Sequence, residues 1–299
     1  MNLKPDDGEN PRPVSGFERG HCGILTLEPT AFSFSQPGPY NGSVAGSDWV
    51  EETKDGVPLF RPVGTSAGLL VAFSGRGASP ESEASPTSFL GRRFAAALGM
   101  DGIPLVRATQ AHGNRAVEIR EKPAESEVRD AGECDALATD LTGVGLIVQT
   151  ADCVPIVLAG HQAVGIVHAG WRGSAKNAAA AGLAALIGLG ERPEDVRTWL
   201  GPSIGACCYE VGREVAAQFA GELVRGRCGG GFLLDLRAAN RVQLEAAGVP
   251  AENISVHPSC TKCGGERFAS YRRDGRRAGR MIALVARLTP RRKARGVRR

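Results

Sequence analysis

The segment from Gln149 to Gly173 constrains the fold of this chain more than any other part. Three short apolar runs bounded by turn residues lie in it or beside it: 145–148, 154–158 and 164–167. Runs of this length between turn signals predict buried strands. A hairpin between the second and third runs would bring Cys153, which precedes one run, close to His168, which follows the other. A cysteine and a histidine held together form either part of a metal site or a nucleophile–base pair.

The composition is that of a globular protein with ample material for a core. The 299 residues are 42% hydrophobic and fit one large domain or two medium ones. No apolar run approaches the ~20 residues that a membrane helix requires, and the polar start lacks the apolar centre of a secretory signal. We therefore expect a disordered lead over residues 1–20, a single domain over 21–288, a cytoplasmic location and no membrane partner.

The positive charge is concentrated at the end of the chain. The formal net charge is +4, but residues 289–299 (TPRRKARGVRR) are rich in arginine and contain no acid. The remainder then carries a small negative charge, which does not favour a nucleic-acid partner for the domain. A polyanion-binding tail is the alternative to the more common solvated, frayed terminus.

Eight cysteines are scattered along the chain without an export signal, which is the pattern expected for free thiols in a reducing compartment. Their positions are Cys22, Cys134, Cys153, Cys207, Cys208, Cys228, Cys260 and Cys263. Cys260 and Cys263 form a lone CxxC motif, with no second pair at zinc-finger spacing. We interpret this motif as a structural half-site or a chance pairing rather than as a redox motif.

The rest of the sequence predicts strands and helices in alternation, without a fixed repeat. Strands are expected over 23–27, 57–60, 69–74, 105–110, 196–200 and 281–286. Helices are expected over 89–98, 134–140, 174–189, 211–219 and 236–247. Hairpins mixed with helices argue against a purely parallel doubly wound sheet. The chain also lacks the glycine-rich Rossmann and Walker phosphate loops.

Two arginines next to glycines are candidate anion-binding residues. Arg76 lies between two glycines after the predicted strand 69–74, where the backbone can approach a ligand while the guanidinium binds an anion. A plain surface turn is the alternative there. Arg172 stands at the start of the predicted helix 174–189, where free amide groups, the helix dipole and the arginine charge combine.

His112 completes a possible three-residue site with Cys153 and His168, because it too follows a predicted strand at a turn. If these strands share a sheet, the three side chains converge. Two imidazoles and one thiolate are three ligands of a tetrahedral zinc ion whose fourth position stays open for water or substrate. The alternative is an inert core cysteine with two hydrogen-bonded loop histidines, and spacing alone favours that alternative.

Five motifs occur in order along the chain: TQAHGN (109–114), QTADCVPIVL (149–158), VHAGWRGS (167–174), GPSIGACCYEVG (201–212) and FASYRRDGRRAGR (268–280). Together they resemble the family first called multicopper polyphenol oxidases, or laccase-domain proteins, over roughly residues 65–288. The resemblance implies an α+β fold: a mixed-sheet layered α/β sandwich of the cytotoxic necrotizing factor-like type. It also implies a zinc ion held by His112, Cys153 and His168.

The activity implied by the resemblance is that of a purine nucleoside phosphorylase. Such an enzyme cleaves adenosine, inosine or guanosine with phosphate to the free base and ribose 1-phosphate, and methylthioadenosine cleavage and adenosine deamination are further family activities. The catalytic residues would be His112, Asp152, Cys153 and His168, and the substrate or phosphate ligands Arg76, Arg172, Ser203, Tyr271 and Arg272. Asp152 would orient a bound water or a ligand imidazole, with turn capping as its alternative role. The loop around Arg76 is shorter than the family pattern.

Other functions compete with this one. A multicopper laccase needs about ten histidines, and this chain has five, so that activity is excluded while a single copper ion remains the alternative metal. A thiol hydrolase would use Cys153 as nucleophile and His168 as base. A non-catalytic protein that binds through its basic tail is a third class. The sequence does not indicate the oligomeric state.

Overall fold

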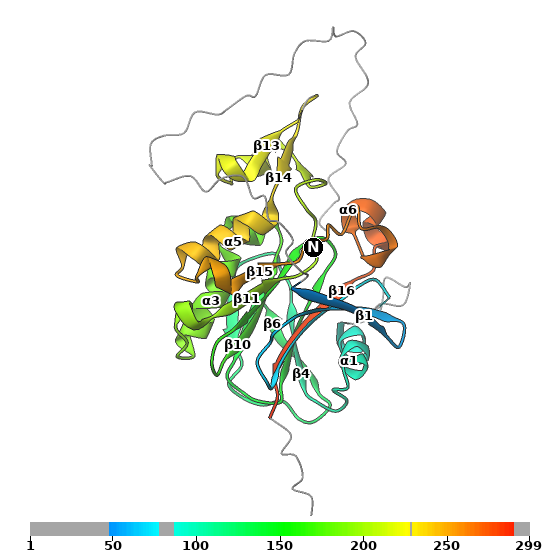
Figure 1. Ribbon diagram of the computed structural model, residues 1–299, viewed down its shortest axis with the longest axis vertical. Helices are drawn as coiled ribbons and strands as arrows, with labels where there is room; N and C mark the ends of the chain where they lie inside the picture. The colour runs from blue at the N-terminus through cyan, green and yellow to red at the C-terminus, as the bar shows by residue number, and fades with distance from the viewer. Residues whose placement is uncertain (1–47, 78–86, 228, 290–299) are drawn as a thin grey trace, which may run out of the picture.

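Two β-sheets packed face to face form the centre of the computed structural model, which describes residues 48–77, 87–227 and 229–289 (Figure 1). Helices cover the outer face of each sheet, so the layers run helix, sheet, sheet, helix. This arrangement confirms the layered α+β fold expected from the sequence. The expected lead over 1–20, the strand over 23–27 and the tail from 290 onwards lie outside the described residues.

Within the described residues, the first sheet has seven strands and the second has six. In spatial order, the first consists of β1 (Trp49–Lys54), β2 (Val57–Pro62), β3 (Leu69–Ser74), β16 (Met281–Arg287), β8 (Gly145–Thr150), β4 (Leu105–Thr109) and β6 (Val128–Glu133). The second consists of β15 (Ile254–Val256), β11 (Arg197–Leu200), β9 (Val154–Ala159), β10 (Val164–Ala169), β7 (Ala136–Thr139) and β5 (Ala116–Glu118). A small third sheet consists of β12 (Glu210–Val211), β14 (Phe232–Leu234) and β13 (Val224–Gly226).

Strand β16 shows why the core strands are apolar without alternation. Met281, Ala283 and Val285 point between the two sheets. Ile282 and Leu284 point to the other face, against helix α1 (Thr87–Ala97). Because successive side chains of a strand point to opposite faces, a strand covered on both sides needs apolar residues at every position.

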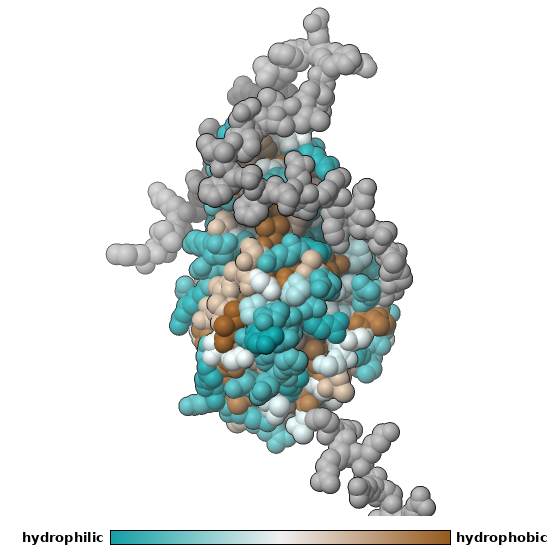
Figure 2. Space-filling model, turned by 60° about the vertical axis from the view of Figure 1, so that its left-hand side comes forward, coloured by the Kyte–Doolittle hydropathy of each residue, from teal (hydrophilic) through white to brown (hydrophobic). Residues whose placement is uncertain are grey.

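Helix α3 (Ala178–Gly188) packs on the second sheet against β10 and β7. The other α-helices of the described residues are α2 (Trp171–Ala175), α4 (Arg213–Ala216), α5 (Leu236–Ala246) and α6 (Tyr271–Asp274). None of the helices in the described ranges is long and apolar enough to cross a membrane. In Figure 2, hydrophobic residues on the visible face form small groups among hydrophilic ones, a distribution common on globular proteins.

Three predicted helices differ from the structure. Residues 134–140 contain strand β7, because pairing with β10 and β5 outweighs their helical propensity. The region 174–189 is two helices, α2 and α3, separated at Asn177, whose backbone φ is 60°. The expected helix over 211–219 is reduced to α4, since residues 210–211 belong to β12.

Candidate metal centre

The hairpin of β9 and β10 brings Cys153 and His168 together, as the sequence predicted. In its antiparallel register His168 lies opposite Pro155. Cys153 immediately precedes β9, so its side chain lies beside the end of β10. The hairpin is held by backbone hydrogen bonds between buried strands, which fixes the relative position of the two side chains.

His112 reaches the same place from the other sheet, on the turn that follows β4. One ligand atom from each of His112, Cys153 and His168 lies within 4.8 Å of the other two. The two imidazole rings are nearly perpendicular, with centroids 4.8 Å apart. His168 is buried, Cys153 is half-buried and His112 is exposed. The cluster therefore lies where the end of β4 in one sheet meets the end of β10 in the other, and its His112 side is exposed to solvent.

Asp135 connects the three elements of this cluster, although no pattern in the sequence indicated it. Its carboxylate is 1% exposed. One oxygen, Oδ1, accepts from the backbone N–H of His112 at 3.0 Å and lies 2.8 Å from His168 Nδ1. The other, Oδ2, accepts from the N–H groups of Gly113 at 2.6 Å and Ala111 at 3.2 Å. When His168 Nδ1–H donates to Asp135, its Nε2 is left free to bind a metal.

The charges within the cluster favour a thiolate. Burial alone would raise the pKa of Cys153, but the charge of His168 and hydrogen bonds from both histidines lower that pKa to about 6. Burial would lower the pKa of His168, but the charge of Cys153 and the bond to Asp135 raise it to about 9. Burial opposes ionisation of Asp135 too, yet the bonds from His168 and the backbone N–H groups lower its pKa. The thiolate is the form of cysteine that binds metals and attacks electrophiles.

The donor set and its spacing fit a zinc ion. Zinc–ligand distances of about 2.0–2.3 Å in a tetrahedron place ligand atoms about 3.3–3.8 Å apart, a spacing that small rotations of these side chains provide. Gly170 leaves the necessary space: a methyl group there would lie 3.0 Å from Cys153 Sγ and 3.0 Å from His112 Cδ2. Three protein ligands with one open side are the arrangement of catalytic zinc sites.

Gly173 holds helix α2 against the turn that carries His112. A methyl group at this position would lie 2.6 Å from the carbonyl oxygen of Gly113. We predict that Gly173→Ala destabilises the fold by about 1–3 kcal/mol through overpacking, although alanine favours a helix by about 1 kcal/mol over glycine. The displaced turn also weakens metal binding. Urea denaturation and a zinc titration measure the two effects.

Gly188→Ala is the matched control for this prediction. Gly188 is also helical, but the atom that its methyl group would meet is the flexible end of Glu118. This variant is expected to keep wild-type stability, or to gain up to about 1 kcal/mol. If Gly173→Ala matched Gly188→Ala in both measurements, the close approach at Gly113 would have no energetic role.

Tyr209 is a second residue near the cluster that the sequence did not indicate, although it lies within the motif at 201–212. Its ring is buried. Burial, followed by the charge of Cys153, raises the pKa of Tyr209 to about 12, while the charges of Arg272 and Arg172 oppose this shift. The Arg272 guanidinium lies over the Tyr209 ring, 5.1 Å from its centroid. Tyr209 is therefore within electrostatic reach of Cys153, and both arginines are within electrostatic reach of Tyr209.

Asp152 has a different set of contacts from that expected of a residue orienting a ligand imidazole. Its Oδ1 accepts from Thr261 Oγ1 at 2.6 Å and its Oδ2 from the backbone N–H of Arg272 at 2.6 Å. The Asp152 carboxylate, next to Cys153, thus binds the loop that carries Thr261 and the start of helix α6. The carboxylate that accepts a hydrogen bond from the His168 imidazole is Asp135 instead.

The remaining predicted residues differ in accessibility. Arg172 is exposed and lies over Trp171, 4.5 Å from the ring centroid. Arg76 forms ion pairs with Glu266 at 2.7 Å and Asp274 at 3.7 Å. Tyr271 is 54% exposed, whereas Ser203 is fully buried. Arg172 is therefore the better-placed cation for an incoming anion, because the charge of Arg76 is already shared with two carboxylates.

Comparison with known proteins identifies the family. The family model described as multi-copper polyphenol oxidoreductase laccase matches residues 90–288, and the chain belongs to this family. It is 38% identical over 203 residues to adenosine deaminase RL5 from an unknown prokaryotic organism, covering 64% of this chain and 78% of that protein. It is 40% identical over 200 residues to a purine nucleoside phosphorylase of Deinococcus radiodurans, covering 64% and 74%.

A solved structure supports the same fold. The crystal structure of YlmD from Geobacillus stearothermophilus matches with a TM-score of 0.67 at 30% sequence identity, covering 77% of this chain and 96% of that chain. The matched length includes most of the described residues. The layered sandwich is therefore the fold of the family and not a feature of this chain alone.

Proposed function

We propose that this protein is a zinc-dependent purine nucleoside phosphorylase, which cleaves adenosine, inosine or guanosine with phosphate. The observation that carries the proposal is the open cluster of His112, Cys153 and His168, oriented by a buried carboxylate. The names of the relatives support the substrate class, since they include purine nucleoside phosphorylases and an adenosine deaminase. Methylthioadenosine is a further candidate substrate, and copper is the alternative metal.

The reaction requires an anion site and a way to stabilise the departing base. A phosphate oxygen attacks the anomeric carbon of the ribose, the glycosidic bond breaks, and the purine leaves with the bonding electrons and takes up a proton. Arg172 is exposed and carries the charge that binds phosphate. Asp135 keeps His168 in one tautomer and holds the His112 turn in place, so the cluster is preorganised. Zinc, when bound, supplies a Lewis acid and lowers the pKa of a coordinated water.

The direct test is product analysis with the purified full chain. Inosine and phosphate should give hypoxanthine and ribose 1-phosphate in equal amounts, and omission of phosphate should stop base release. Adenosine separates two related activities, because phosphorolysis yields adenine whereas deamination yields inosine and ammonia. Release of base at the same rate without phosphate would show a hydrolase and contradict the proposal.

A thiol hydrolase is the second candidate, and one arrangement favours it. Cys153, His168 and Asp135 follow the order of nucleophile, base and orienting carboxylate that covalent hydrolases use. The two candidates differ in metal content and in the state of the thiol. Stoichiometric zinc with Cys153 protected from iodoacetamide supports the phosphorylase, whereas a metal-free protein with rapid alkylation at Cys153 supports the hydrolase.

A further inference from the structure

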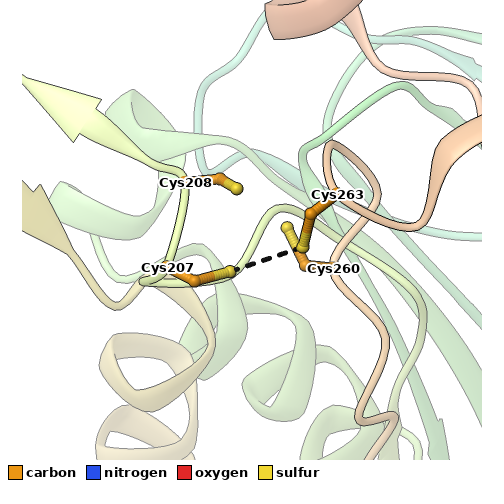
Figure 3. Close-up of side chains that lie close together, drawn as sticks. All are labelled: Cys207, Cys208, Cys260 and Cys263. Atoms are coloured by element: carbon orange, nitrogen blue, oxygen red, sulfur yellow. Dashed lines mark hydrogen bonds between the residues drawn. The ribbon is translucent and has the colours of Figure 1, made fainter.

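A second candidate metal-binding group, which consists of four cysteines, lies apart from the His112 cluster and between two loops (Figure 3). Cys207 and Cys208 lie on the loop after β11, and Cys260 and Cys263 lie on the loop after β15. The four sulfur atoms lie within 4.8 Å of one another, and Figure 3 shows them directed into the space between the loops. The second pair that the lone CxxC motif lacked in the sequence is thus the adjacent pair Cys207–Cys208.

Backbone contacts hold the two loops in register. Ser203 and Cys260 form a parallel β-bridge, and the N–H of Thr261 donates to the Ser203 carbonyl at 3.0 Å. Within each loop, the N–H of Cys208 donates to the Gly205 carbonyl at 2.9 Å and that of Gly264 to the Cys260 carbonyl at 2.8 Å. The cysteines are therefore brought together by ordered backbone rather than by chance contacts of flexible side chains.

The sulfur separations fit a shared metal ion rather than a disulfide. Cys207 Sγ lies 3.7 Å from Cys263 Sγ. A tetrahedral zinc ion with Zn–S bonds of about 2.3 Å requires sulfur atoms about 3.8 Å apart. A disulfide instead requires about 2.05 Å. The sulfur atoms lie up to 4.8 Å apart, and small side-chain rotations bring them to the tetrahedral distance.

Two polar groups lie close to the sulfur atoms. The N–H of Gly205 donates to Cys260 Sγ at 3.2 Å, as backbone amides do around metal-bound sulfur. The Arg237 guanidinium is close by: a methyl group on Gly205 would lie 2.5 Å from Arg237 Nη2 and 3.3 Å from Cys207 Sγ. A buried amide donor thus contacts the Cys260 sulfur, and a positive charge lies near the Cys207 sulfur, beside a group that would be strongly negative when ionised.

We propose that Cys207, Cys208, Cys260 and Cys263 bind a structural zinc ion, distinct from the metal of the His112 cluster. Four thiolates in tetrahedral spacing form a closed zinc site without an open position for substrate. The ion joins the two loops beside the functional site: Tyr209 follows Cys208, and Thr261 hydrogen-bonds Asp152 next to Cys153. Metal binding at the four cysteines therefore holds Tyr209 and Thr261 in place beside the His112 cluster without contacting that cluster directly.

Metal counting on two complementary variants tests this proposal. The wild-type full chain, purified under reducing conditions, should contain two equivalents of zinc per chain. Cys260→Ser/Cys263→Ser should contain one equivalent, and His112→Ala should also contain one. If the double variant kept the same zinc content as the wild type, the four-cysteine site would be refuted, whatever the outcome for the proposed phosphorylase activity.

A spectroscopic measurement covers the case in which the double variant fails to fold. X-ray absorption at the zinc edge of His112→Ala protein observes the remaining ion alone. It should report four sulfur neighbours at about 2.3 Å. A mixed nitrogen and sulfur shell, iron in place of zinc, or a metal-free protein with a Cys207–Cys263 disulfide in its non-reduced peptide map would overturn the proposal.

Discussion

His112→Ala is expected to abolish phosphorolysis while leaving the fold intact. His112 is exposed and lies on a turn after β4, so its removal creates no cavity in the core. It supplies one of the three ligand atoms, and a two-ligand site binds zinc far more weakly. Lewis-acid stabilisation is worth several kcal/mol, and 1.36 kcal/mol corresponds to a tenfold change in rate. The turnover of inosine should therefore fall by about a thousandfold or more.

His161→Ala is the matched control, since His161 is an exposed histidine at the opposite, turn end of the β9–β10 hairpin. It should keep wild-type turnover and zinc content. A chelator that removes zinc from the wild type should reproduce the loss seen in His112→Ala, and added zinc should restore only the wild type. Equal turnover by both histidine variants would show that the cluster takes no part in the reaction.

The sequence predicted the strands of the centre because they are continuous apolar runs between turns. β3, β9, β10 and β16 are buried on both faces, and that burial is what makes their composition distinctive. The same reasoning failed for β7, whose four residues carry no helical or strand period. Its identity as a strand depends on pairing with β10, which lies far from it in sequence.

The sequence indicated that the candidate ligands Cys153 and His168 meet, but it did not indicate the residue that supports them. Cys153 and His168 are local to one hairpin, so their spacing indicated that they meet. Asp135 acts through contacts with residues 111–113 and 168, and no spacing rule relates these positions. The sequence did not indicate that Cys207 and Cys208 lie beside the CxxC motif, for the same reason. The four cysteines come together where two loops from distant strands are joined by backbone bonds.

Asp135→Asn is expected to weaken metal binding by about 10- to 100-fold, the usual effect of losing a carboxylate behind a ligand histidine. Each carboxylate oxygen serves two donors: Oδ1 serves the His112 N–H and His168, and Oδ2 serves the N–H groups of Gly113 and Ala111. An asparagine amide has one acceptor atom, so in either orientation its NH₂ group faces two donors. Unsatisfied donors cost about 1–3 kcal/mol each, so we also expect a loss of about 2–4 kcal/mol in the free energy of unfolding.

The pH dependence separates this role of Asp135 from a general loss of packing. The folded-state pKa of Asp135 lies below its ordinary value of 3.8, so its stabilisation is present at neutral pH and is lost as the pH falls through the depressed pKa. The stability difference between wild type and Asp135→Asn should therefore shrink in acid, as urea denaturation at several pH values would show. Asp140→Asn, at the exposed far end of β7, should change neither stability nor zinc affinity. A constant difference at every pH, with unchanged zinc affinity, would mean that the Asp135 charge does not organise the cluster.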